Sequence, residues 1–165
     1  MRIGQGYDIH AFDPNRVLML GGVKIPGAWG LRGHSDADAL LHAITDAVLG
    51  AAGLGDIGEH FPDTDPAWKD APSAALLAEV LTKAEARGLH VVNVDCTVVA
   101  ERPRLSPHKQ AMRERIAALI GVDASAVNIK ATTHEGMGPV GRGEGIAAMA
   151  VVLLDGRDAD ASKGS

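Results

Sequence analysis

The nine residues from Ile146 to Leu154 are all apolar, and this run constrains the fold more than any other segment. Its length suits a strand, and a membrane-spanning helix would need roughly 18 apolar residues. Successive side chains of a strand point to opposite faces, so both faces of this one must be buried. Amphipathic helices elsewhere in the chain can cover one face of the sheet. The other face then needs a partner subunit, for which cyclic symmetry is the usual arrangement.

Apolar periodicity and turn residues predict an α+β fold, a mixed β-sheet with helices packed on one face. The expected strands cover residues 2–10, 17–20, 23–26, 91–99, 127–132 and 146–154, and the expected helices about 35–53, 73–87 and 106–121. Ser35 is the expected N-cap of the first helix. Residues 27–33 and 53–65 are expected to be loops. Residues 1–155 should form a single domain, and the polar residues 156–165 a disordered tail.

Composition bounds the class of protein and its partners. The 165 residues carry a net charge of −5 without a basic cluster, which argues against nucleic acid as a partner. The one cysteine, Cys96, excludes an intrachain disulfide and fits a reducing compartment. The N-terminus has no apolar signal region. We therefore expect a soluble cytoplasmic protein that binds neither nucleic acid nor membranes.

Asp8, His10 and His42 are the strongest candidates for a metal site. Asp8 and His10 lie two apart in a predicted strand and should point the same way. His42 lies in the middle of a predicted helix, and two imidazoles with one carboxylate suit zinc with an open fourth position. Asp46, one turn after His42, is the expected acceptor of the other ring N–H, whereas Asp38 alone is expected on a solvated helix face. The alternative is a chance Asp-x-His pair, which is common.

Two loops have compositions that suit phosphate binding. Residues 55–65 are rich in Gly, Asp and Pro, which indicates either a turn-rich connector or a loop for a hydroxylated, phosphorylated ligand. Residues 132–145 are either a wide hairpin loop or an anion site, in which Glu135 offers a ligand for Mg²⁺ or Mn²⁺. Zinc and a second divalent cation could together neutralise and orient a diphosphate, so this inventory suits phosphoryl transfer.

These motifs resemble those of the 2-C-methyl-D-erythritol 2,4-cyclodiphosphate synthase family of the non-mevalonate isoprenoid pathway. The matching stretches occur in order along nearly the whole chain: Gly6-Tyr7-Asp8-Ile9-His10, His34-Ser35-Asp36-Ala37-Asp38, Leu41-His42-Ala43, Thr45-Asp46, Leu54-Gly55-Asp56-Ile57-Gly58, Phe61-Pro62-Asp63-Thr64-Asp65-Pro66, Asn93-Val94-Asp95, Ile129-Lys130-Ala131-Thr132-Thr133 and Gly141-Arg142-Gly143-Glu144-Gly145.

The resemblance implies a homotrimer whose sheets face the three-fold axis and whose active sites lie between adjacent subunits. It implies one Zn²⁺ per subunit, held by Asp8, His10 and His42, and an Mg²⁺ or Mn²⁺ ligated by Glu135. The substrate would be 4-diphosphocytidyl-2-C-methyl-D-erythritol 2-phosphate, whose 2-phosphate attacks its own β-phosphorus and expels CMP. The attacker is already an anion, so no strong general base is needed.

The resemblance also implies roles for residues around these metals. His34 and Thr133 would be catalytic, positioning the phosphates. The remaining substrate-binding residues would be Ser35, Asp56, Ile57, Gly58, Phe61, Asp63, Thr64 and Asp65 around the erythritol phosphate, and Ala100, Pro103, Arg104, Leu105, Ser106, Ala131 and Thr132 around the cytidine. Arg142 would bind an isoprenoid diphosphate in a cavity on the trimer axis. Pro139 stands where the family usually has a Phe that lines this cavity, which puts that ligand in doubt.

Two other functions remain open at this stage. One is a zinc-dependent phosphohydrolase that uses a water at the open zinc position. The other is a non-catalytic trimer that binds a nucleotide or an isoprenoid diphosphate.

Overall fold

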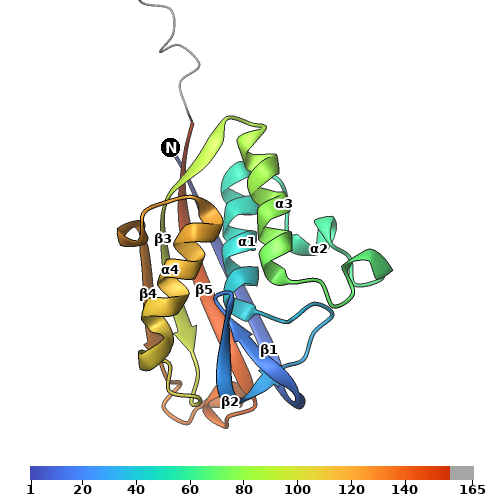
Figure 1. The fold of residues 1–165 in the computed structure, drawn as a ribbon, viewed down its shortest axis with the longest axis vertical. Helices are drawn as coiled ribbons and strands as arrows, with labels where there is room; N and C mark the ends of the chain where they lie inside the picture. Colours follow the sequence, from blue (N-terminus) through green and yellow to red (C-terminus); the bar gives the residue numbers. More distant parts are fainter. Residues whose placement is uncertain (157–165) are drawn as a thin grey trace, which may run out of the picture.

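The computed structural model describes residues 1–156, which form one five-stranded sheet flanked by helices (Figure 1). The strand order is β2-β1-β5-β3-β4, with β3 parallel to β4 and every other neighbouring pair antiparallel. The strands are β1 Arg2–Leu20, β2 Val23–Leu31, β3 Leu89–Val99, β4 Val127–Thr132 and β5 Gly145–Gly156. The longer helices are α1 Ala39–Ala52, α3 Ser73–Glu85 and α4 Lys109–Ile120. Short helical turns are α2 Ile57–His60, η1 Pro66–Trp68, η2 Ser106–His108, η3 Ala124–Ala126 and α5 Gly138–Gly141. The predicted mixed α+β fold is confirmed.

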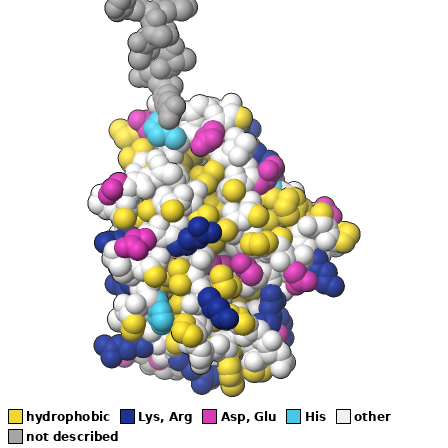
Figure 2. All heavy atoms as spheres, in the orientation of Figure 1, with side chains coloured by type: hydrophobic (Ala, Val, Ile, Leu, Met, Phe, Trp, Pro, Cys, Tyr) yellow, Lys and Arg dark blue, Asp and Glu magenta, His cyan; other side chains and the backbone are white. Residues whose placement is uncertain are grey.

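The three longer helices lie on one face of the sheet, the face turned toward the viewer in Figure 1. α1 packs on β1 and β5, α3 packs on α1, and α4 packs on β4. Charged side chains are scattered over this side of the molecule (Figure 2). Along β5, the alternate residues from Ile146 to Leu154 are buried beneath the helices. No helix among the described residues is long and apolar enough to cross a membrane.

The opposite face of the sheet is apolar and uncovered in the single chain. Ile3, Tyr7 and Ile9 of β1 are 72%, 53% and 47% exposed, and Met149 and Val151 of the adjacent β5 are also exposed. The register places Tyr7 directly beside Met149, so these side chains are neighbours on one surface. An exposed apolar surface of this kind marks an interaction site.

Several predicted boundaries are wrong. β1 is one strand to Leu20, and β2 continues to Leu31 through the expected loop. The reason is that β1 changes partner: it pairs with β5 as far as Ala11 and with β2 from Phe12 onward. The turn residues around Asp13 suggested that the strand ends there. They instead form an irregular part of β1, with shifts in the pairing register between Asp13 and Leu18. The expected loops also contain α2 and α5. Of the predicted tail, Gly156 ends β5 and the other residues lie outside the described part of the chain.

The start of α1 also differs from the prediction, because Asp38 and not Ser35 is its N-cap. Asp38 Oδ1 accepts a hydrogen bond from Leu41 N at 3.0 Å, while Ser35 Oγ accepts from Ala37 N in the preceding turn. Asp38 is fully buried, so the expected solvated position is wrong. Its carboxylate also accepts from Gly21 N at 2.9 Å and Gly22 N at 2.6 Å, which ties the β1–β2 turn to the helix. Burial raises the pKa of Asp38, and these backbone donors offset part of that effect.

Two glycines of β1 let α1 approach the strand closely. A Cβ at Gly4 would lie 1.9 Å from Ala47 O, and one at Gly6 would lie 1.9 Å from Ala43 O. Both obstacles are backbone atoms of α1, which cannot move aside as a flexible side chain can. The missing Cβ atoms therefore set the distance between β1 and the helix that carries His42.

Gly6→Ala should lower the free energy of unfolding by about 3 kcal/mol, because the added methyl group forces strand and helix apart. Chemical denaturation would measure the change. Gly50→Ala is the matched control: Gly50 lies on the exposed side of α1, with no atom within 4 Å of an added Cβ. It should be neutral or stabilising by up to about 1 kcal/mol. Equal stability of Gly6→Ala and the wild type would contradict the close approach.

Candidate metal centre

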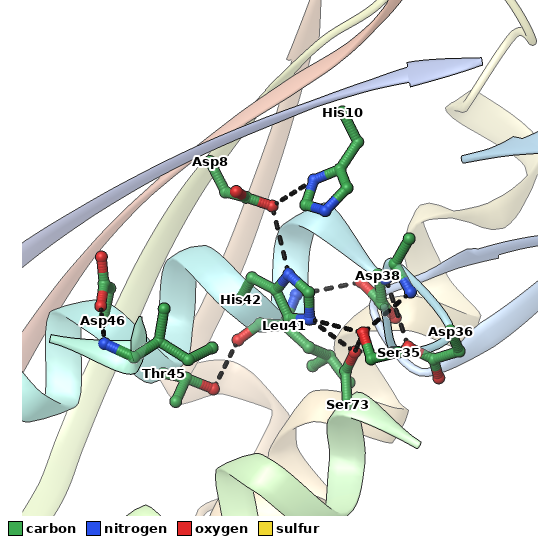
Figure 3. A network of polar contacts seen from close by, with 12 residues as sticks. Asp8, His10, Ser35, Asp36, Asp38, Leu41, His42, Thr45, Asp46 and Ser73 are labelled. Carbon is green, nitrogen blue, oxygen red and sulfur yellow. Dashed lines mark hydrogen bonds and ion pairs between the residues drawn. The ribbon is translucent and has the colours of Figure 1, made fainter. Parts of the chain in front are cut away.

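The three predicted metal ligands meet between β1 and α1 (Figure 3). Asp8 Oδ2 lies 2.7 Å from His10 Nδ1 and 3.3 Å from His42 Nδ1. One ligand atom from each of the three residues lies within 4.8 Å of the others. Asp8 and His10 share a face of β1 because they are two residues apart, and the close packing at Gly6 brings His42 to them.

The donor set fits a cation. Asp8 Oδ2 and His10 Nδ1 are buried and face each other at 2.7 Å, yet neither makes a hydrogen bond of normal geometry, to the other or to any further residue between 1 and 156. Buried polar atoms without such partners are rare and call for an explanation. Two nitrogen atoms and one oxygen atom that converge on a point satisfy three positions of tetrahedral zinc and leave one open.

Electrostatics in the centre also favour a cation. Burial would raise the pKa of Asp8, but the imidazoles of His10 and His42 outweigh it and hold the pKa at about 2. Burial would lower the pKa of His42, but Asp8, Asp38 and Asp36 raise it above its usual value. The site thus holds negative charge that attracts a proton to His42, and a metal ion that binds there must displace that proton.

The predicted partner of the other His42 nitrogen is wrong. His42 Nε2 lies 2.9 Å from Ser73 Oγ and 3.1 Å from Ser35 Oγ. Asp46 Oδ1 instead accepts a hydrogen bond from Ile57 N at 2.8 Å, which joins the start of α2 to α1. Although Asp46 follows His42 by one turn, the imidazole ring points its Nε2 toward the start of α3. The Asp46 carboxylate lies away from that direction and does not contact Nε2 (Figure 3).

A pocket of about 170 Å³ opens beside the metal centre. Its lining includes the predicted residues His10, His34, Ser35, His42, Ile57, Gly58, Phe61 and Asp63. Trp68 and Leu76 also line it and were not predicted. The ring of Trp68 packs edge-on against Phe61, with 4.8 Å between ring centroids. A tryptophan in a turn-rich segment of a chain with only 3% aromatic residues was the signal that could have found it.

Three residues predicted for this pocket do not line it. Asp56 caps α2 by accepting from Glu59 N at 3.0 Å, and Asp65 caps η1 by accepting from Ala67 N at 2.9 Å. Thr64 is exposed between them. Local caps thus account for the two carboxylates.

The residues predicted to hold cytidine and the second metal gather at the carboxyl ends of the parallel strands β3 and β4. Ala100 N donates to Thr132 O at 3.0 Å, and Glu101 Oε1 accepts from His134 N at 2.8 Å. Thr133 Oγ1 donates to Glu135 Oε1 at 3.2 Å. The two loops are therefore adjacent, and the hydroxyl and carboxylate predicted to meet phosphate and metal lie side by side.

The side chains of this second cluster differ in accessibility. Arg104, Ser106, Ala131, Thr132, Thr133 and Glu135 are exposed, Ala100 and Leu105 are buried, and Pro103 lines a separate cavity of about 320 Å³ with Phe12 and Trp29. Arg142 is exposed and donates from Nε to Glu144 Oε1 at 2.6 Å. The loop predicted over residues 132–145 contains α5.

The second cluster is distant from the metal centre within one chain. Ile9, Ala147, Val99 and Thr132 form one row across β1, β5, β3 and β4. Three steps between neighbouring strands amount to roughly 14 Å. His10 and Thr133 therefore lie on opposite sides of the sheet's width.

Comparisons with known proteins give one consistent result. The family model described as YgbB family matches residues 1–155. The 2-C-methyl-D-erythritol 2,4-cyclodiphosphate synthase of Geotalea uraniireducens is 59% identical over 155 residues, which cover 94% of this chain and 99% of that protein.

Solved structures agree. A structure of a 2C-methyl-D-erythritol-2,4-cyclodiphosphate synthase in a CDP-bound form is 40% identical with a TM-score of 0.86, covering 93% of this chain and 100% of that one. The bifunctional IspDF from Campylobacter jejuni is 46% identical with a TM-score of 0.91, covering 95% of this chain and 42% of that longer one. With a family match over nearly its whole length and relatives of this identity, the chain belongs to the YgbB family.

Proposed function

We propose that this protein is a 2-C-methyl-D-erythritol 2,4-cyclodiphosphate synthase, a phosphorus–oxygen lyase. It converts 4-diphosphocytidyl-2-C-methyl-D-erythritol 2-phosphate to the cyclic diphosphate and CMP. The convergence of Asp8, His10 and His42 beside a pocket that the two histidines line is the observation that carries this proposal. The identity of 59% to a synthase, over 94% of this chain, supports the same reaction.

The reaction forms one bond and breaks another at the same phosphorus. An oxygen of the 2-phosphate bonds to the β-phosphorus, and the bond from that phosphorus to the oxygen it shares with the α-phosphate breaks. CMP leaves with the electron pair, so no water is consumed. Two anionic groups must be brought together, and proximity with positive charge lowers that barrier.

The residues of the centre are suited to hold a cation against this pair of phosphates. Asp8, His10 and His42 would hold one Zn²⁺ per subunit, and Glu135 would ligate Mg²⁺ or Mn²⁺. When bound, these ions supply the positive charge that the transferring phosphoryl group needs. His34, which lines the pocket, and Thr133 would position the phosphate oxygens. Ile57 and Gly58 of α2, together with Asp63, would enclose the erythritol phosphate.

We further propose a homotrimer with its active sites between subunits. Two observations support it. The exposed apolar sheet face, with Ile3, Tyr7, Ile9, Met149 and Val151, needs to be covered, and three copies around an axis would cover it. The two halves of the predicted site are also far apart in one chain. The second cluster of a neighbouring copy could complete the pocket and hold the cytidine.

Product analysis tests the reaction and separates it from the alternatives. Incubation with the substrate should yield CMP and the cyclic diphosphate in equal amounts, both measured by ³¹P NMR. A zinc phosphohydrolase would give linear phosphates, and a binding protein would give no product.

Exhaustive chelation should remove activity, and Zn²⁺ with Mg²⁺ should restore it. Full activity after chelation, verified by elemental analysis, would contradict the metal requirement.

A further inference from the structure

We propose that Ser73 is a positioning residue for the metal centre. Its hydroxyl accepts a hydrogen bond from His42 Nε2–H and donates one to Asp36. This arrangement leaves His42 Nδ1 free to bind the metal ion. The inference rests on the metal site of the proposed function and adds two residues to it.

His42, Ser73 and Asp36 are linked in a row by hydrogen bonds. Ser73 Oγ lies 2.9 Å from His42 Nε2, and it donates a short hydrogen bond to Asp36 Oδ1. Figure 3 shows Ser73 on the side of the imidazole ring opposite Asp8, with Asp36 beyond it. Asp36 belongs to the turn before α1 and Ser73 to the first turn of α3, so their hydrogen bond joins segments 37 residues apart.

The direction of these hydrogen bonds follows from what each group can donate. A carboxylate only accepts, so the Ser73 proton lies toward Asp36. The Ser73 oxygen then has only lone pairs for His42, and Nε2 must supply the proton. A neutral imidazole carries one proton, for which the Asp8 carboxylate beside Nδ1 and the Ser73–Asp36 pair beside Nε2 compete. The Ser73–Asp36 pair draws the proton to Nε2, the position that leaves the Nδ1 lone pair for the metal ion. The nitrogen that is set free is the one at the metal centre, 3.3 Å from Asp8 Oδ2.

Nothing in α3 itself requires the Ser73 hydroxyl. The N-cap of α3 is Pro72, and this helix has no side-chain cap hydrogen bond. Ser73 is nevertheless fully buried, and a buried hydroxyl costs free energy unless it is hydrogen-bonded. Its described partners are His42, Asp36 and, at 3.4 Å, Ser35 Oγ. The hydroxyl is therefore placed for the histidine and not for the helix.

Ser35 also approaches His42 Nε2, at 3.1 Å, but it does not replace Ser73. Its oxygen already accepts a hydrogen bond from Ala37 N at 3.0 Å. It also has no described contact with a carboxylate that would orient its proton. Ser73 is therefore the serine whose hydroxyl proton is oriented by Asp36, and whose oxygen lone pairs face His42 Nε2.

Ser73→Ala should weaken Zn²⁺ binding by about 10- to 100-fold, since losing the partner of a metal-bound histidine has effects of this size. Competition of the purified full-length protein with a chromophoric chelator measures this without any activity assay. Long-range ¹H–¹⁵N NMR of the metal-free protein at alkaline pH should show a larger share of the Nε2-protonated tautomer of His42 in the wild type than in the alanine variant. In that variant the tautomer should shift toward Nδ1–H, which Asp8 favours.

Asp36→Ala provides a second test that leaves Ser73 in place. Without its acceptor, the Ser73 O–H can turn toward His42, which favours the wrong tautomer and should weaken Zn²⁺ binding to a similar extent. Asp36→Asn keeps an acceptor oxygen and should recover most of the affinity. Thr45→Val is the matched control, because it removes a second buried hydroxyl, one in α1 whose described hydrogen bond is to Leu41 O. Its Zn²⁺ affinity should equal that of the wild type.

The outcomes separate this inference from the metal site itself. Wild-type protein that does not bind Zn²⁺ would overturn both. Wild-type binding with unchanged affinity and tautomer in Ser73→Ala and Asp36→Ala would overturn the role of Ser73 alone. A loss of the same size in Thr45→Val would also overturn it, because the effect would then be one of general packing.

Discussion

His42→Ala should reduce cyclodiphosphate formation by on the order of 10³-fold and leave the folded structure intact. The substitution removes one of three ligands. The two that remain, Asp8 and His10, lie two residues apart on one face of β1 and cannot enclose a cation from the helix side. Positive charge at the phosphates is then lost. Steady-state kinetics with zinc content per chain would measure both consequences.

His90→Ala is the control for His42→Ala. His90 is partly buried at the start of β3, where it pairs with Asp155 at the far end of the sheet from His10. Its loss should leave zinc content and rate near those of the wild type. Normal turnover by His42→Ala, or zinc content unchanged in that variant, would refute the assigned metal centre.

Asp38→Ala should lower the free energy of unfolding by about 3–5 kcal/mol. Three backbone N–H groups, those of the buried Gly21 and Leu41 and of the partly buried Gly22, would lose their acceptor at once. The first turn of α1 would also lose its cap. Urea denaturation of the metal-free protein would measure the loss without a contribution from bound metal.

Asp123→Ala is the matched control for this cap. Asp123 also caps a helical turn, η3, by accepting from Ser125 N at 2.8 Å, but it is exposed, so water can replace it. Its loss should have a small fraction of the effect of Asp38→Ala. Equal effects of the two substitutions would show that local capping, and not the tie between α1 and the β1–β2 turn, accounts for Asp38.

The grouping of the metal ligands could be predicted because local periodicity determined most of it. Alternation along a strand places Asp8 and His10 on one face, whatever the strand packs against. The apolar stripe of α1 determines which side of the helix faces the sheet. His42 lies next to that stripe, so periodicity left only the position of α1 along β1 undetermined. Gly4 and Gly6 fix how closely α1 approaches β1, but the sequence does not show that these two glycines have this role.

The partners of these ligands could not be predicted from helical spacing. Asp46 is near His42 in sequence, yet its carboxylate meets Ile57 N. Ser73 is 31 residues away from His42, and nothing in its neighbourhood distinguishes it from an ordinary first-turn serine. Its contact exists because α3 packs against α1, and no short-range pattern contains that information.

The amino-acid sequence by itself determined the alternation of strands and helices, the apolar strand that must be covered on both faces, and the residue types that suit a zinc ion. These properties depend on period and composition, which are local. The tertiary structure alone decided that Asp38 is a buried cap, that Ser73 faces His42, and that two strands separate the metal centre from the Thr132–Glu135 loop. Each of these depends on how distant segments pack, and packing is set by the whole core at once.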